Sequence, residues 1–168
     1  MLFMFNARLL RIQYGIKRDK LERKTDMLVR ERMSTDVVAV SPDESAALAA
    51  RLMSRHNVGA LPVCTAEGKL RGMVTDRDIV LRCVANGYDP AKTPLREIMS
   101  RAVVTVTPGE DTERAMSLMA SGQLRRLPVS ENGRVVGILS LGDLAWERET
   151  DTEAGEALRR ISRNVRRG

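Results

Sequence analysis

The chain has 168 residues, enough for one domain or two small fused ones, and 43% of them are hydrophobic while only 3% are aromatic. Its core must therefore be aliphatic. No apolar run approaches the roughly 20 residues of a membrane-spanning helix, and one His with two Cys in dissimilar contexts excludes a zinc-binding constellation.

The formal net charge of +6 is concentrated at the two ends. Residues 1–26 carry seven Lys or Arg against three Asp or Glu, and residues 155–168 carry five Arg against one Glu. A solvated tail is the first interpretation of each end, and attachment to nucleic acid or an anionic surface is the alternative. Few aromatic residues are interleaved with these charges, so we do not expect a nucleic-acid partner.

Residues 1–26 lack the continuous apolar region and the small-residue cleavage site of a secretory signal. A transit-like or surface helix stays open, and Met27 is an alternative natural start. Cys64 and Cys83 have no CxxC spacing, which indicates a reducing compartment although a disulfide stays open. We therefore expect a cytoplasmic protein.

From Val29 onward the chain repeats itself, and this is its main organisational feature. The offset is 66 residues at first and 65 after a Gly-containing hairpin, where a surface loop tolerates the loss of one residue. The matched segments are 30–44 with 96–110, 61–63 with 127–129, and 72–78 with 137–143. The predicted parts are a basic N-terminal extension (1–26), a first repeat (27–88), a linker (89–94), a second repeat (95–149) and a C-terminal helix with a basic tail (150–168).

Each repeat is predicted to have the element order β-α-β-β-α. A short strand, at 37–40 or 103–106, leads to a capping box with Pro at the first helical position, which begins at Ser41 or Thr107. The helices run to about Arg55 and Ser121. Met53, Met116 and Met119 lie at helical spacing on them, and we expect these methionines to fill the core or a dimer interface. The remaining predicted elements are strands 60–64, 70–75, 126–130 and 134–140, a helix over 78–85, and a helix that begins near Asp143.

Beyond the second repeat, a helix is predicted over 153–162. We expect it to pack on the core through Leu158 and Ile161, with Trp146 as a packing anchor.

A seven-residue motif ends the second hairpin strand of each repeat, at 72–78 and at 137–143. It reads Gly, two apolar residues, a hydroxyl, two variable residues and Asp, a pattern typical of a strand that runs into a helix. The Gly allows another backbone to approach closely. A hydroxyl and a carboxylate beside free backbone N–H groups can hold a sugar-phosphate. The alternative is that each pair simply forms a capping box at a helix start.

With two β-α-β-β-α repeats and this motif in each, the sequence resembles a tandem pair of CBS domains, a Bateman module. The resemblance covers about 28–146. It rests on segments 33–42, 57–63 and 72–79, and on 99–108, 125–129 and 137–144 in the second repeat. It implies an α/β (α+β) fold of two repeats related by pseudo-twofold symmetry, in a stand-alone bacterial or archaeal protein.

The resemblance also implies two clefts that bind adenine nucleotides (AMP, ADP or ATP). Carried over by position, Thr75 and Asp78 form one site, and Ser140 and Asp143 form the other, with the hydroxyl on phosphate and the carboxylate on ribose. Further candidates for base or phosphate contact are Ala60, Leu61, Arg77, Arg126 and Leu127.

The second repeat departs from the first within the motif, because Leu141 and Gly142 stand where the first has Asp76 and Arg77. It therefore lacks a basic neighbour. In the first repeat, Asp76 adds a negative charge that disfavours a polyphosphate unless Arg77 offsets it.

Catalysis has little support in this sequence. No P-loop and no Gly-x-Ser-x-Gly elbow occurs, and His56 is the single His. We expect no enzyme activity and no required cofactor or metal. The expected function is a regulatory ligand-binding module that forms a homodimer and signals to an unidentified protein partner. The alternative is a nucleotide-independent dimerisation or interaction scaffold whose basic tails are contact points.

Overall fold

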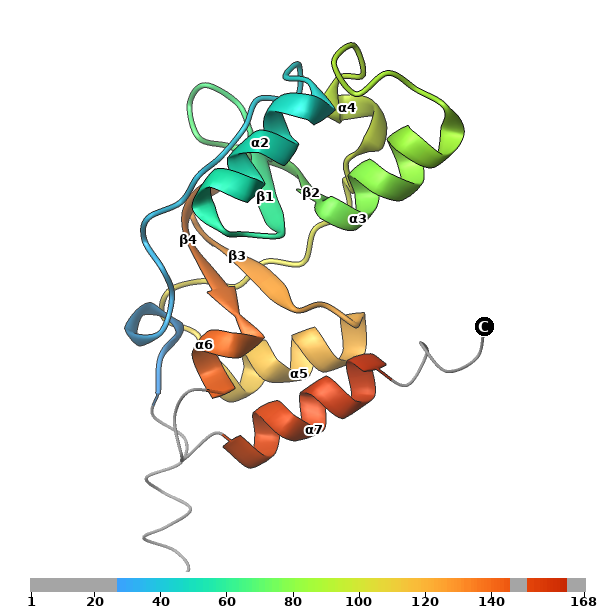
Figure 1. Cartoon of the computed structure of the whole chain (residues 1–168). Helices are drawn as coiled ribbons and strands as arrows, with labels where there is room; N and C mark the ends of the chain where they lie inside the picture. Colours follow the sequence, from blue (N-terminus) through green and yellow to red (C-terminus); the bar gives the residue numbers. More distant parts are fainter. Residues whose placement is uncertain (1–26, 146–150, 163–168) are drawn as a thin grey trace, which may run out of the picture.

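The structure, a computed structural model, describes residues 27–145 and 151–162 and consists of two similar halves (Figure 1). Each half is built on a two-stranded antiparallel sheet. In the first half β1 (Ala60–Cys64) pairs with β2 (Leu70–Thr75), and in the second half β3 (Arg126–Glu131) pairs with β4 (Arg134–Ser140). All four strands lie within one residue of their predicted bounds, and the expected α/β (α+β) class is confirmed.

The strands predicted at 37–40 and 103–106 are wrong as strands, because each shrinks to a single parallel bridge. In the first half the bridge joins Val40 to Val63, and the Val40 N–H donates to the carbonyl of Pro62 at 3.0 Å. The next rung would require an N–H on Pro62, which proline lacks, so the pairing stops there.

The helices that cover the sheets begin later than predicted. Helix α2 (Ala46–His56) begins at the N-cap Ser45, and α5 (Thr112–Gly122) begins at the N-cap Asp111. Each predicted start, which lies four residues upstream of its N-cap, is therefore wrong, whereas the predicted ends are correct to within one residue.

The residues of the two predicted capping boxes form turns instead of helices. In the second turn the Glu110 N–H donates to the Thr107 carbonyl at 3.2 Å, and the Glu110 carboxylate accepts from the Thr107 N–H at 2.6 Å. The hydrogen bond to the carboxylate lowers the pKa of Glu110 below its usual value. The carbonyls of Pro108 and Glu110 accept from the N–H groups of Arg30 and Val29, so this turn receives the incoming chain.

Helical chain follows each hairpin directly. In the first half α3 (Asp76–Asp78), a π-helical turn η2 (Ile79–Cys83) and a 3-10 turn η3 (Val84–Asn86) form one continuous run that ends at Gly87, with a φ of 75°. The helix predicted here is present but begins two residues earlier. In the second half the corresponding helix is α6 (Leu141–Ala145).

Helix α7 (Asp151–Ser162) runs alongside α5 and also contacts α6 (Figure 1). Ala157 and Ile161 are buried in the core of the second half, as predicted for Ile161. The prediction for Leu158 is wrong, because its side chain is 46% exposed. Trp146 lies outside the described residues.

The first segment of each sequence repeat packs into the core of the other half. Val29 on η1 (Val29–Glu31) is fully buried among second-half residues, whereas Leu95 and Ile98 on α4 (Leu95–Ile98) are buried among first-half residues. The packing units therefore differ from the sequence repeats. Each hydrophobic core contains the opening segment of the repeat that forms the opposite half.

Both cores are aliphatic, as the composition requires. Met53, Met116 and Met119 are buried core residues, which is the first of their two predicted roles. Cys64 and Cys83 are buried free thiols, and burial raises the pKa of the Cys64 thiol.

The opening segments, 29–34 and 95–104, are called the exchanged segments below. They cross the hairpins at Gly137 and Gly72. The Ser100 N–H donates to the Met73 carbonyl at 2.8 Å, and the Met73 N–H donates back to Ser100 at 2.9 Å. A Cβ on Gly72 would lie 2.8 Å from the carbonyl oxygen of Ser100, and one on Gly137 would lie 2.7 Å from the sulfur of Met33. The predicted role of these glycines in close backbone approach is confirmed.

Within residues 27–145 and 151–162, every helix is too short or too polar to cross a bilayer. The same residues contain no group of three or more His, Cys, Asp and Glu side chains that could hold a metal ion. The N-terminal extension, residues 1–26, and the end of the basic tail, residues 163–168, lie outside the described chain.

We predict that Gly72→Ala lowers the free energy of unfolding by about 1–3 kcal/mol, because the added methyl group would overlap the Ser100 carbonyl and force the two backbones apart. Gly109→Ala is the matched control, since a Cβ at Gly109 meets nothing within 4 Å. Urea denaturation of both variants measures the difference. Equal stabilities would contradict the assigned close contact.

Candidate ligand-binding cleft

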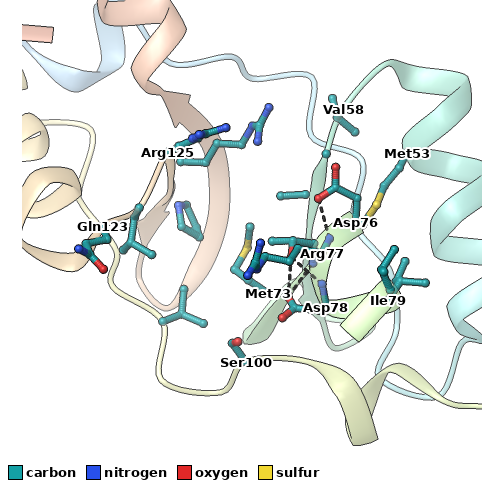
Figure 2. A pocket seen from close by; sticks show the side chains of 18 of the residues that line it. Met53, Val58, Met73, Asp76, Arg77, Asp78, Ile79, Ser100, Gln123 and Arg125 are labelled. Carbon is teal, nitrogen blue, oxygen red and sulfur yellow. Dashed lines mark hydrogen bonds between the residues drawn. The ribbon is translucent and has the colours of Figure 1, made fainter. Parts of the chain in front are cut away.

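One open cleft of about 1400 Å³ lies between the two halves and is lined by both (Figure 2). The first half contributes the end of α2, the loop before β1 and the junction of β2 with α3. The second half contributes the loop between α5 and β3, and the segment after α4 lines the cleft as well. The lining residues are Ala50, Met53, Ser54, 57–60, Met73, 75–80, Ser100, 102–104, 123–126, Pro128 and Ile161.

The hydroxyl and carboxylate of the first motif form a capping box at the junction of β2 and α3. The Asp78 N–H donates to the Thr75 hydroxyl oxygen at 3.1 Å. In return one carboxylate oxygen of Asp78, Oδ2, accepts from the Thr75 N–H at 2.9 Å and lies 2.8 Å from the Thr75 hydroxyl. The capping alternative is therefore realised, and the Thr75 hydroxyl is already engaged with Asp78.

The other oxygen of the same carboxylate, Oδ1, takes no part in the cap. Its nearest cation is Arg82, whose Nη2 lies 3.4 Å away. The Asp78 side chain is only 14% exposed, yet Asp78 lines the cleft. A carboxylate oxygen can accept more than one hydrogen bond, so Oδ1 remains able to receive a ligand hydroxyl.

The backbone N–H groups at the start of α3 are not free, contrary to the sequence-based expectation. The Asp76 N–H donates to the Gly59 carbonyl at 3.1 Å, and the Arg77 N–H donates to the Asp76 carboxylate at 2.7 Å. The third N–H, that of Asp78, belongs to the cap. A phosphate at this site would therefore have to be held by side chains.

The charged residues of the lining come from both halves. Arg77 and Asp76 belong to α3, whereas Arg125 and Arg126 belong to the second half; Figure 2 shows Arg125 across the cleft from Asp76. A Cβ on Gly59 would lie 3.0 Å from Asp76 Oδ2 and 3.7 Å from Arg126 Nη1, so these two opposite charges approach the same point of the cleft wall. With Asp78, the lining carries three Arg and two Asp.

The second motif makes the same two reciprocal backbone-to-side-chain hydrogen bonds but lies away from this cleft. The Ser140 N–H donates to Asp143 Oδ2 at 2.8 Å, and the Asp143 N–H donates to the Ser140 hydroxyl at 3.1 Å. Asp143 is exposed, and Leu141 is buried in the core. Each hydroxyl–carboxylate pair thus caps the helix that follows the hairpin in its own half, and the structure does not bring the two pairs together.

Of the predicted base-contacting residues, Ala60 and Arg126 line the cleft, whereas the side chains of Leu61 and Leu127 do not. Leu61 and Leu127 are 1% and 0% exposed and belong to the two hydrophobic cores. The reason is strand alternation, because successive residues of a strand point to opposite faces.

Sequence reasoning missed the contribution of Ser100, Val103 and Val104 to the cleft. Val103 and Val104 were assigned to the strand predicted at 103–106, and Ser100 was given no site role, but the segment that contains all three passes along the first half. Gln123 and Leu124 were missed as well. The sequence repeat could have revealed those two, because the offset of 66 matches Gln123 and Leu124 to positions 57 and 58, which precede β1.

Comparison with known proteins agrees with this architecture. The model of the CBS domain matches residues 29–84 and 95–150. Among curated proteins, the CBS domain-containing protein YhcV of Bacillus subtilis is 47% identical over 134 residues, which cover 80% of this chain and 94% of YhcV.

Two solved structures illustrate the structural similarity. Hypoxic Response Protein I, solved with two coordinated zinc ions, is 34% identical with a TM-score of 0.67, and the match covers 72% of this chain and 98% of that one. The CBS domain pair of protein MJ0100, solved with 5-methylthioadenosine and S-adenosyl-L-methionine, is 29% identical with a TM-score of 0.65; the match covers 71% of this chain and 94% of that one. The repeats, the fold and the relatives agree, and the chain belongs to the CBS-domain family as a tandem CBS pair.

Proposed function

We propose that the chain is a regulatory module that binds an adenine nucleotide, AMP, ADP or ATP, in the cleft and signals occupancy to a separate protein partner. The observation that carries this proposal is the composition of the cleft. It combines a carboxylate at a strand-to-helix junction with arginines from both halves and an apolar wall. The MJ0100 pair, solved with two molecules that contain adenosine, supports an adenosine-bearing ligand.

Asp78 is the residue proposed to hold the ribose. Its Oδ2 atom is fixed by the cap, which sets the orientation of the carboxylate, and its Oδ1 atom can accept from a sugar hydroxyl. A hydrogen bond to an ionised group is stronger than one between neutral groups, so this contact would contribute much of the affinity.

Arginine side chains are proposed to hold the phosphate, because the N–H groups of α3 are already engaged. Arg77 and Arg126 reach the cleft from opposite halves, and a guanidinium matches the geometry of phosphate oxygens. Three Arg against two Asp leave a small positive excess in the lining. This balance fits a monophosphate better than a triphosphate, so we place AMP first among the three nucleotides.

Apolar residues are proposed to receive the adenine base. Val58, Ala60 and Pro128 line the cleft beside the two hairpins, and Val103 and Val104 line it from the exchanged segment. Pockets for small ligands commonly combine such an apolar wall with a few polar groups that fix the orientation.

We predict that Asp78→Asn weakens AMP binding by about 1.5–3 kcal/mol, because a ribose hydroxyl loses its charged acceptor while the amide oxygen can still serve in the cap. Calorimetric titration with adenosine, AMP, ADP and ATP, with and without magnesium, measures the affinities. Asp143→Asn reports on the second motif by the same titration.

Glu97→Gln is the matched control for the lost charge, since Glu97 is an exposed carboxylate on α4. AMP binding that is saturable and equally strong in wild type and Asp78→Asn would remove Asp78 from the site. No binding of any of these ligands to wild type would refute the nucleotide proposal and leave the second candidate.

The second candidate is a nucleotide-independent homodimerisation scaffold, and one surface of the first half favours it. Leu81 and Val84 are 48% and 54% exposed on η2 and η3, and Tyr88 follows them, also exposed. Large apolar side chains gathered on a helical surface are typical of an interaction site. We propose that a second copy of this chain covers them, whether or not a nucleotide is bound.

We predict that the wild-type chain sediments as a dimer and that Val84→Glu shifts it toward monomer, because a buried, unpaired carboxylate in the interface is costly. Leu158→Glu is the control, since Leu158 is an equally exposed apolar residue on α7. Sedimentation velocity distinguishes the species. A dimer that persists in Val84→Glu would exclude this surface.

A further inference from the structure

Arg82 on η2 joins two parts of the molecule that are distant in the sequence. Its Nη1 donates to the carbonyl oxygen of Ile98 at 2.8 Å and to the hydroxyl of Ser100 at 3.2 Å. Its Nη2 lies 3.4 Å from Asp78 Oδ1. One planar guanidinium thus connects the carboxylate of the cleft to the exchanged segment.

Ser100, which accepts a hydrogen bond from Arg82, takes part in the contact between the halves. Ser100 lines the cleft and exchanges two backbone hydrogen bonds with Met73 on β2. From Ser100 the chain continues through Val103 and Val104, which also line the cleft, into the second half. The position of Ser100 therefore affects how the two halves meet.

The second repeat offers an internal comparison. Ser34 exchanges the same pair of backbone hydrogen bonds with Ile138, each at 2.9 Å. In the sequence, the offset of 65 residues matches Arg82 to Glu147, which lies outside the residues that the structure describes. A carboxylate cannot donate to a carbonyl as a guanidinium does, so the sequence does not repeat this donor at the matching position of the second repeat.

We propose that Arg82 is a positioning residue that couples the Asp78 carboxylate to the contact between Ser100 and Met73, and hence to the arrangement of the two halves. This inference rests on the proposed function for its ligand, because Oδ1 of Asp78 is the atom offered to the ribose. The guanidinium is rigid, so a change at Nη2 is transmitted to the bonds made by Nη1. Occupancy of the cleft is thereby read out at the pairing of the exchanged segment.

The test is amide hydrogen exchange, followed by NMR, at Ser100 and Met73, with Ser34 and Ile138 as the internal reference. In the ligand-free protein, Arg82→Gln is expected to speed exchange at Ser100 and Met73 by roughly fivefold or more and to leave the reference pair unchanged. Asp78→Asn is expected to act in the same direction. The double variant is expected to add little to either, since both changes break one connection.

Two further variants separate positioning from charge and from general destabilisation. Arg82→Lys keeps the positive charge near Asp78, but a single ammonium cannot span both partners, so we expect retained AMP affinity together with lost protection at Ser100. Arg71→Gln removes an exposed arginine of β2 that does not line the cleft, and should change nothing.

The same exchange measurement with AMP completes the test. In wild type AMP is expected to change protection at Ser100 and Met73, and in Arg82→Gln this response is expected to disappear. Exchange at Ser100 in ligand-free Arg82→Gln equal to that in Arg71→Gln would overturn the inference. A wild-type protein that ignores AMP while the ligand-free effects hold would instead refute the proposed function and leave the connection standing.

Discussion

Two backbones pass each other closely at Gly72 and again at Gly137, where an added Cβ would lie 2.8 Å from the Ser100 carbonyl oxygen and 3.1 Å from the Ser34 carbonyl oxygen. The rest of the structure depends on these two crossings. They allow Ser100 to pair with β2 and Ser34 to pair with β4, which carries the opening segment of each repeat into the opposite core. The cleft follows from the same constraint, because the crossing chain supplies part of its wall.

The capping box and the ligand site use the same carboxylate without conflict. In Asp78 one oxygen closes the helix start and the other faces Arg82, so the cap fixes the orientation of the group that the site would use. As a consequence, the N–H groups of α3 donate to acceptors within the protein and are not available to a ligand. An anion at the start of α3 would then need donors other than these N–H groups. The arginines of the lining come from both halves, so a phosphate held between them would join the halves electrostatically.

Local features of the fold could be predicted from the sequence, and features that depend on distant contacts could not. The hairpins, the strand-to-helix motif and the close approach at Gly72 follow from patterns a few residues long. The predicted start of α2 was wrong because carbonyls near Ser41 accept hydrogen bonds from the segment before Met99 and not from a helical turn. Nothing in the sequence near residue 41 identifies that distant partner. Leu61 was misassigned for a related reason, since alternation shows that a residue faces one side of a strand but not which side is the core.

The exchange of opening segments has a consequence for how the chain could be divided. Cut at the linker, 89–94, each piece would keep a hairpin and its helices but lose the buried residues that fill its core, Val29 for one half and Leu95 with Ile98 for the other. Two such pieces could fill their cores only if each inserted its opening segment into the core of the other. The repeat is thus no self-sufficient unit, and the smallest foldable object that this sequence encodes is the pair.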